Sequence, residues 1–104
     1  MRKMCFAAAG LFYFVALSAI ADDFVVLGDM PYGDDESTVT RYSALLKKIN
    51  DERLSFVVHV GDVKSGSSEC SDKSFEMQRA FFARLDHPLI YTPGDNEWTD
   101  CHRI

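Results

Sequence analysis

The dipeptide Gly-Asp occurs three times in the chain, at 28–29, 61–62 and 94–95, and each copy lies 33 residues after the previous one. A short apolar run precedes each copy: "FVVLG" at 24–28, "LSFVVHVG" at 54–61 and "PLIYTPG" at 88–94. The β-branched residues, the lengths of the runs and the turn residues that follow them predict three strands. Because each period contains a strand, the regular spacing indicates successive strand–helix units of equal length rather than repeats made only of helices.

Two helical patterns lie between the predicted strands. In the segment 37–54, apolar side chains recur at the spacing of one buried stripe: Val39, Tyr42, Leu45, Leu46 and Ile49. Thr38 is the expected N-cap of this helix, because its hydroxyl can accept a hydrogen bond from the first turn. The second pattern, around 72–85, turns another apolar set to one face: Phe75, Ala80, Phe81, Phe82 and Leu85. Ser71 or Asp72 is expected to cap its start.

The order of these elements is β-α-β-α-β, which predicts an α/β fold with a parallel sheet and right-handed crossovers. The three runs are almost continuously apolar, as is typical of parallel strands that are covered on both faces. Three parallel strands and two helices make about half of an α/β domain. We therefore expect an open edge and one uncovered face.

The aspartates of the three Gly-Asp pairs are candidate metal ligands. In open parallel sheets, ligands bind outside the carboxyl ends of the strands, and neighbouring strands lie about 5 Å apart. We therefore expect Asp29, Asp62 and Asp95 to converge at one edge. Clustered carboxylates raise one another's pKa unless a cation lies among them. A single Gly-Asp would be ordinary turn chemistry, but three in phase indicate a divalent metal such as Mg, Mn, Fe or Zn.

The segments "VVLGDMPYG", "FVVHVGDVKSG" and "LIYTPGDNEW" resemble the first three motifs of the calcineurin-like metallophosphoesterases, over residues 24–98. The resemblance implies the first half of a metallophosphoesterase-type α/β sandwich, with 22–104 as a partial domain. It also implies two divalent metal ions and a phosphate ester substrate that a metal-activated water hydrolyses. The family's later histidine motifs, which complete both metal shells, have no match here. The alternative is a non-catalytic cation-binding or structural remnant, so whether the chain is an enzyme stays open.

The resemblance also implies roles for single residues. Asp29 matches the ligand of the first metal, and Asp62 matches the aspartate that bridges both metals. In the third motif, an alignment without gaps puts Asp95 at the asparagine that binds the second metal, Asn96 at the catalytic histidine and Glu97 at the following acid. If the match slips by one position, Asn96 is itself the metal ligand. Both side chains offer oxygen ligands, so the alternatives stay open.

The chain departs from the first motif at Pro31, which stands where the family often has histidine. Proline has no side-chain donor. Tyr32 and Asp34 are possible replacements for that ligand.

Further polar residues are candidates for catalysis or substrate binding. His102 can supply an imidazole in place of the missing catalytic histidine, although an exposed loop histidine is the commoner case. Arg103 is a candidate phosphate ligand, because guanidinium matches phosphate geometry, and a surface ion pair is its alternative. Lys64 can contact the same phosphate or simply belong to a solvated loop. His59, on the second predicted strand, favours a hydrogen-bonded core histidine over a ligand.

The first 21 residues have the pattern of a secretory signal peptide. Basic Arg2 and Lys3 precede the apolar run "FAAAGLFYFVALSAIA", which ends in an A-x-A arrangement at Ala21. Cleavage after Ala21 would release a periplasmic or secreted protein, and an uncleaved anchor is the alternative. The formal net charge of −5 would become about −7. Such an acidic domain is not expected to bind nucleic acid by charge, and no membrane contact is expected after cleavage.

The chain has three cysteines, and Cys5 lies within the predicted signal peptide. The remaining pair, Cys70 and Cys101, is even in number and would be exported to an oxidising compartment. A disulfide between them is therefore predicted, and two free thiols are the alternative. Their spacing matches no zinc-binding pattern.

Overall fold

The computed structural model describes residues 22–102. The elements follow in the order β1 (Phe24–Leu27), α1 (Glu36–Asn50), β2 (Phe56–His59), α2 (Asp72–Phe82), β3 (Leu89–Tyr91) and the short 3₁₀ helix η1 (Asp100–His102). The strands form one parallel sheet in the order β1-β2-β3. The predicted βαβαβ arrangement is therefore confirmed. Within 22–102, neither helix is long and apolar enough to cross a bilayer. The predicted signal peptide lies outside the described residues.

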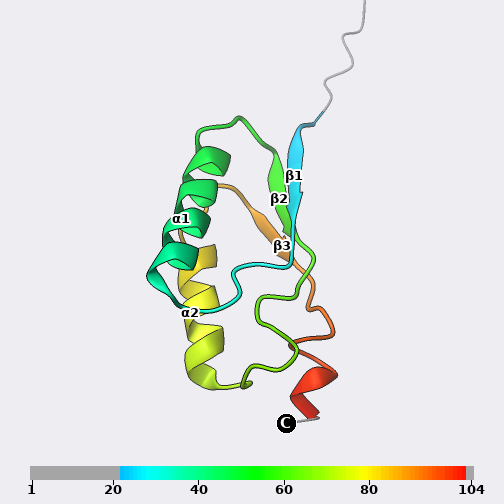
Figure 1. The fold of residues 1–104 in the computed structure, drawn as a ribbon. Coiled ribbons are helices and arrows are strands. Elements are labelled where there is room, and N and C mark those ends of the chain that lie inside the picture. The colour runs from blue at the N-terminus through cyan, green and yellow to red at the C-terminus, as the bar shows by residue number, and fades with distance from the viewer. Residues whose placement is uncertain (1–21, 103–104) are drawn as a thin grey trace, which may run out of the picture.

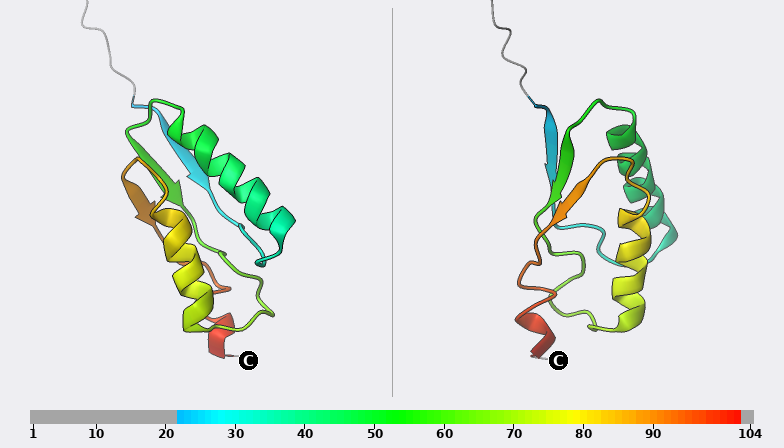
Figure 2. Two further views of the ribbon diagram at one scale, coloured as in Figure 1. Left: turned by 90° about the vertical axis from the view of Figure 1, so that its left-hand side faces the viewer. Right: turned by 180° about the vertical axis from the view of Figure 1, so that it is seen from behind.

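Both helices lie on the same face of the sheet (Figures 1 and 2). Sequential strand order with right-handed crossovers requires this, because each crossover returns over the same face. The three strands end at one edge of the sheet, and both helices begin near that edge (Figure 1). The loops that follow β1, β2 and β3 are thereby brought together, and these loops carry the candidate site residues.

The hydrophobic core lies between the sheet and the two helices. Its buried members are Leu27, Tyr42, Leu46, Ile49, Val57 and Phe81. The Tyr42 and Phe81 rings meet edge to face, with centroids 5.0 Å apart, and so join α1 to α2. Val39 and Leu45 pack against this cluster, so the predicted apolar stripe of α1 is confirmed.

Two details of the helices differ from the predictions. The N-cap of α1 is Asp35, whose Oδ1 accepts a hydrogen bond from the Thr38 amide at 3.0 Å, so the prediction of Thr38 as the cap was wrong. An aspartate in extended backbone is as good a cap as threonine, and it starts the helix three residues earlier. Ser71 caps α2, as one of the two expected candidates.

The predicted apolar face of α2 is confirmed in part: Phe81 is buried and Leu85 packs against the core, but two other members do not. Phe75 and Ala80 are exposed, whereas Gln78 and Phe81 are buried. The Gln78 side chain donates a hydrogen bond to the Val63 carbonyl at 3.0 Å. This bond holds a polar residue against the loop after β2, and a purely hydrophobic pattern cannot anticipate it. The helix ends at Phe82, because Ala83 is already its C-cap.

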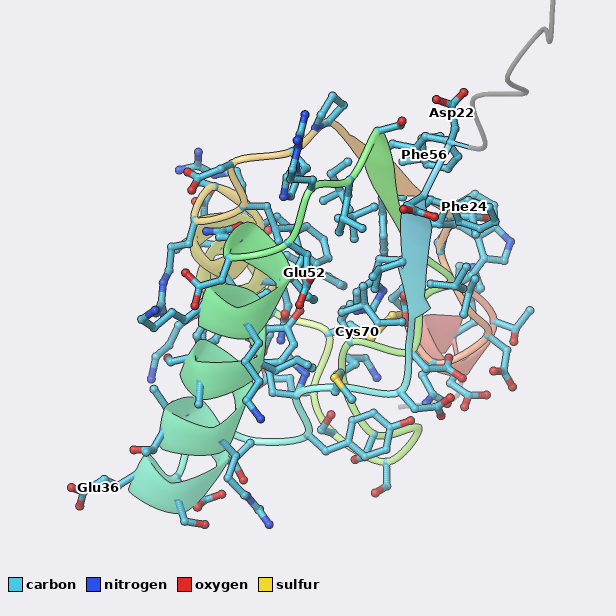
Figure 3. All side chains as sticks on the ribbon, turned by 90° about the horizontal axis from the view of Figure 1, so that it is seen from above. Asp22, Phe24, Glu36, Glu52, Phe56 and Cys70 are labelled. Atoms are coloured by element: carbon cyan, nitrogen blue, oxygen red, sulfur yellow. A yellow bond between two sulfur atoms is a disulfide. The ribbon has the colours of Figure 1, made fainter. Side chains whose placement is uncertain are left out.

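The other face of the sheet carries apolar side chains that the described residues leave uncovered. Phe24 and Ile90 are 53% and 54% exposed, and Val26 and Val60 are exposed as well. Phe24 stacks on Phe56 with ring centroids 5.0 Å apart, on the side away from α1 (Figure 3). The expectation of one uncovered face is thus confirmed.

Candidate metal centre

Asp29 and Asp62 occupy equivalent places just beyond the ends of β1 and β2. Both have a positive φ, 57° and 55°, which is uncommon for residues other than glycine. The Asp29 amide donates to the Gly61 carbonyl at 3.1 Å and joins the two turns. Left-handed backbone costs about 1 kcal/mol or more per non-glycine residue. Such strain is concentrated at functional sites, and here it occurs twice at one edge of the sheet.

The glycines that precede the second and third aspartates allow two loops to touch. A Cβ atom at Gly61 would overlap the Gly94 amide nitrogen and would lie 2.7 Å from the Gly94 Cα. A Cβ atom at Gly94 would overlap the Asp62 Oδ1. The Gly-Asp pairs therefore do more than form turns. Their glycines let the loop after β3 lie directly against the Asp62 carboxylate.

A chain of hydrogen bonds joins the two carboxylates to the third loop. The Tyr32 hydroxyl donates to Asp29 Oδ1 at 3.0 Å, and the Asn96 Nδ2 donates to the Tyr32 hydroxyl at 3.2 Å. The Asn96 backbone amide donates to Asp62 Oδ1 at 3.2 Å. Its Nδ2 also donates to the Lys64 carbonyl at 2.9 Å, which fixes the orientation of the amide because a carbonyl only accepts. The three loops thus meet at Asp29, Asp62 and Asn96.

The structure distinguishes the environments of the two candidates in the third motif. Asn96 joins the hydrogen-bond chain just described. Asp95 is exposed, and its backbone carbonyl accepts from the amides of Trp98 and Asp100 at the start of the final turn. Among the described residues, no hydrogen bond links the Asp95 side chain to Asp29 or Asp62. Asn96 thus joins the site through its donor groups, whereas Asp95 acts on Asp62 through its charge, and which of the two would be a third ligand stays a prediction.

The electrostatics of the site are those of a carboxylate cluster. The hydrogen bond from Asn96 lowers the pKa of Asp62, but desolvation and repulsion from Asp95, Glu97 and Asp29 outweigh it, so the pKa is raised. Repulsion of this kind is relieved when a cation lies between the carboxylates. Desolvation and the neighbouring Asp29 raise the pKa of Tyr32 to about 12, so its hydroxyl stays protonated and can donate.

Within residues 22–102, no group of three or more His, Cys, Asp or Glu side chains could hold a metal ion. Asp29 and Asp62 lie close enough for their charges to interact, and Asn96 adds an amide whose nitrogen, not its oxygen, bonds the Lys64 carbonyl and the Tyr32 hydroxyl. Mg²⁺ and similar hard cations are commonly held by one or two carboxylates together with water and substrate phosphate. Asp29 and Asp62 are donors of this kind, and within residues 22–102 no third acidic, cysteine or histidine side chain joins them in a group that could hold a metal. Pro31 is buried, and Tyr32 takes the position beside Asp29.

Glu97 is a residue whose role the sequence interpretation missed. Its Oε1 accepts hydrogen bonds from the Gly94 amide at 3.0 Å and the Tyr91 hydroxyl at 2.7 Å, and its Oε2 accepts from the Val63 amide at 3.4 Å. The carboxylate thus ties the loop after β3 to the loop after β2. The spacing from Gly94 to Glu97 is that of a capping box, and this was the signal available in the sequence.

The pH dependence of stability is expected to report on Glu97. Burial raises the pKa of its carboxyl, but the hydrogen bonds from Tyr91, Gly94 and Val63 outweigh burial and bring the pKa below the ordinary 4.5. A depressed pKa contributes stability above the unfolded-state pKa, and this contribution is lost as the pH falls through the folded-state value. Glu97→Gln should therefore lower the melting temperature at neutral pH and flatten its fall below pH 4.5. An equal fall of the melting temperature below pH 4.5 in the wild type and in Glu97→Gln would contradict this.

Lys64 and His102, two further predicted site residues, do not join the carboxylates. Lys64 is only 5% exposed, and its ammonium donates to the carbonyls of Ser65 and Ser68 at 2.9 and 3.0 Å. In this structure it stabilises the loop and is not directed at Asp29 or Asp62. His102 is exposed in η1, and within 22–102 no hydrogen bond connects its ring to the site. Arg103 lies outside the described residues.

His59 is a fully buried core residue, as predicted. Its Nδ1 accepts from the Gly61 amide at 3.2 Å, and its Nε2 lies 3.3 Å from the Met30 carbonyl, so Nε2 carries the proton. Burial lowers its pKa. The neutral ring therefore hydrogen-bonds the loop after β1 at Met30 and the loop after β2 at Gly61, and it lies in the core.

The predicted Cys70–Cys101 disulfide is present, with Cα atoms 5.6 Å apart and a sequence separation of 31. It connects the loop after β2 to the short helix η1. Cys70 lies in the same loop as Asp62, and Cys101 follows the loop that carries Asn96. The disulfide therefore constrains the loops that form the site.

No protein-family model matches this chain, and neither does any curated protein or solved structure in the comparisons. The chemical interpretation of the site rests on its own geometry.

Proposed function

We propose that the chain forms part of a metal-dependent phosphoesterase, as its resemblance to the calcineurin-like metallophosphoesterases implies. One observation carries the proposal. Asp29 and Asp62 stand in left-handed conformations at the ends of adjacent parallel strands, and Tyr32 and Asn96 link them by hydrogen bonds. An edge that concentrates negative charge and strained backbone suits a divalent cation, and the bound cation would in turn attract a phosphate.

The residues take distinct roles in this proposal. Asp29 and Asp62 hold the cation, and Asn96 is its third oxygen donor or a donor to the phosphate. Tyr32 keeps its proton at neutral pH and donates it in a hydrogen bond to Asp29, which orients that carboxylate. When bound, divalent ions neutralise the phosphate and lower the pKa of the attacking water. The disulfide favours an exported location, in agreement with the predicted signal peptide.

A second candidate is a cation-binding domain without turnover. It is favoured by the small donor set, since residues 22–102 hold no cluster of three or more His, Cys, Asp or Glu ligands. A two-metal centre requires more ligands than Asp29, Asp62 and Asn96 supply, and the resemblance places histidines among them. Binding without hydrolysis would be the chemical property of such a domain.

A phosphatase assay separates the two candidates. The chain is incubated with Mn²⁺ and an aryl phosphate ester, beside Asp62→Asn and the control Asp86→Asn, which changes an exposed carboxylate outside the candidate site. The proposed enzyme gives Mn-dependent turnover in the wild type and the control. In Asp62→Asn, turnover falls by about a hundredfold or more, the size typical of lost metal chemistry. Mn²⁺ binding with no turnover in any protein would support the second candidate instead.

A further inference from the structure

A cleft of about 470 Å³ lies beside the candidate metal centre. It is bounded by the loop after β1, the loop after β2 and the first half of α2, and it borders the site at Tyr32. Its volume lies within the range of small-molecule sites. The carboxylates Asp29 and Asp62 are not part of its wall, and Tyr32 is the residue that it shares with the candidate centre.

The cleft contains a buried acceptor with unmet hydrogen-bonding capacity. Gln78 lines it and is only 4% exposed. Its Nε2 donates to the Val63 carbonyl at 3.0 Å, which fixes the amide orientation, while its Oε1 has no hydrogen-bond partner. Buried polar atoms are almost always paired, and an unpaired acceptor is costly. Oε1 itself exposes less than 1 Å² of surface, so a donor from the cleft would satisfy it once the side chains over it shift.

The remaining walls indicate the chemistry of that ligand. Four serines line the cleft, and their hydroxyls already hydrogen-bond within the loop and the helix cap, so they offer a ligand their remaining acceptor capacity: Ser65, Ser68, Ser71 and Ser74. The exposed rings of Tyr32 and Phe75 offer flat apolar surface. A ligand with many hydroxyls and apolar C–H faces matches both kinds of wall, because it can exchange hydrogen bonds with serines and pack on the rings.

The charge of the walls argues against an ionic ligand. Two lysines and two acids line the cleft, and the Lys64 ammonium is already bound by two carbonyls. The acids are Asp34 and Glu69. Neither sign prevails, so an anion such as a second phosphate or a nucleic acid would meet as much repulsion as attraction.

We propose that this cleft binds a neutral cyclic polyol, such as a hexose or an inositol, with one hydroxyl donating to Gln78 Oε1. The binding site stands on the cleft alone. Only one addition rests on the proposed function, namely that the polyol would be the alcohol part of the phosphate ester. The attached phosphate would then reach past Tyr32 toward Asp29.

The test is an NMR titration of the ¹⁵N-labelled chain with glucose and with myo-inositol, without metal or phosphate. The Gln78 side-chain amide and the backbone amides of the cleft should shift with saturation. Phe75→Ala should weaken binding by about tenfold, as expected for the loss of a central aromatic contact. The control Phe24→Ala, which changes an exposed ring on the opposite face of the sheet, should bind as the wild type does. Gln78→Leu should also weaken binding, with its folded state verified by circular dichroism.

Three results would overturn the inference: no saturable shifts, shifts that map outside the cleft, or equal affinities in wild type and Phe75→Ala. Unchanged affinity in folded Gln78→Leu would overturn the assigned contact, because water would then be satisfying Oε1. Since the titration contains neither Mn²⁺ nor an ester, its failure leaves the phosphatase assay unaffected. Failure of that assay likewise leaves the polyol titration as a separate result.

Discussion

The double replacement Cys70→Ser and Cys101→Ser is expected to lower the free energy of unfolding by about 3–4 kcal/mol. The disulfide closes a segment with a sequence separation of 31. Without the bond, the unfolded chain regains the entropy of that open loop. The folded chain loses the covalent link between the loop after β2 and η1. Urea unfolding, followed by circular dichroism, measures the change.

Reduction provides the matched control for this prediction. The wild-type chain in excess reductant should unfold at the urea concentration of the double variant, and the reductant should not affect that variant. A loss below about 1 kcal/mol would contradict the account, because it would mean that the unfolded chain gains little conformational entropy when the disulfide is removed.

Gly61→Ala is expected to cost about 3–5 kcal/mol of stability, from two additive causes. Gly61 has a φ of +91°, which alanine adopts only with strain. Its new methyl group would also overlap the Gly94 amide and lie 2.7 Å from the Pro93 carbonyl carbon. These are backbone atoms, so relief requires that the loop after β3 move away from Asp62. Thermal or urea unfolding measures the cost.

Gly33→Ala separates the two causes. Gly33 has a similar φ of +94°, but a Cβ atom there meets nothing closer than Asp35 Oδ2 at 3.7 Å. It should therefore cost only about 1–2 kcal/mol, the conformational part of the Gly61 effect. Equal losses in both variants would contradict the close approach of the two loops. A larger loss at Gly61 would support it.

Much of the fold could be predicted from the sequence, because hydrophobic periodicity and strand order depend on local pattern. The stripe from Val39 to Ile49 and the parallel strands follow from such patterns. Phe81 and Leu85 of the predicted α2 face do pack on the core, but the burial of Gln78 could not be predicted, since its bond is to the Val63 carbonyl in another loop. The cap of α1 was wrong because Asp35 and Thr38 have similar capping ability, and side-chain chemistry alone does not separate them.

The candidate site divides in the same way. The Gly-Asp spacing placed Asp29 and Asp62 at neighbouring strand ends, where the structure also has them. The part played by Glu97 escaped prediction, because its three partners come together only when two loops pack. Lys64 was expected at a phosphate because of its charge, but carbonyl groups of its own loop bind it. Sequence patterns thus predict which side chains follow the strand ends. Hydrogen bonds between the loops decide which of these side chains point toward Asp29 and Asp62.

Calorimetric titration of Mn²⁺ into the metal-free chain tests the central claim most directly, with Asp62→Asn and Asp86→Asn measured beside it. The account predicts saturable binding to the wild type and Asp86→Asn, and affinity at least about tenfold weaker in Asp62→Asn, because half of the carboxylate pair is neutralised. Asparagine tolerates the left-handed backbone of Asp62, so the fold should persist. No binding to the wild type, or equal binding to all three proteins, would contradict a metal centre at this edge of the sheet.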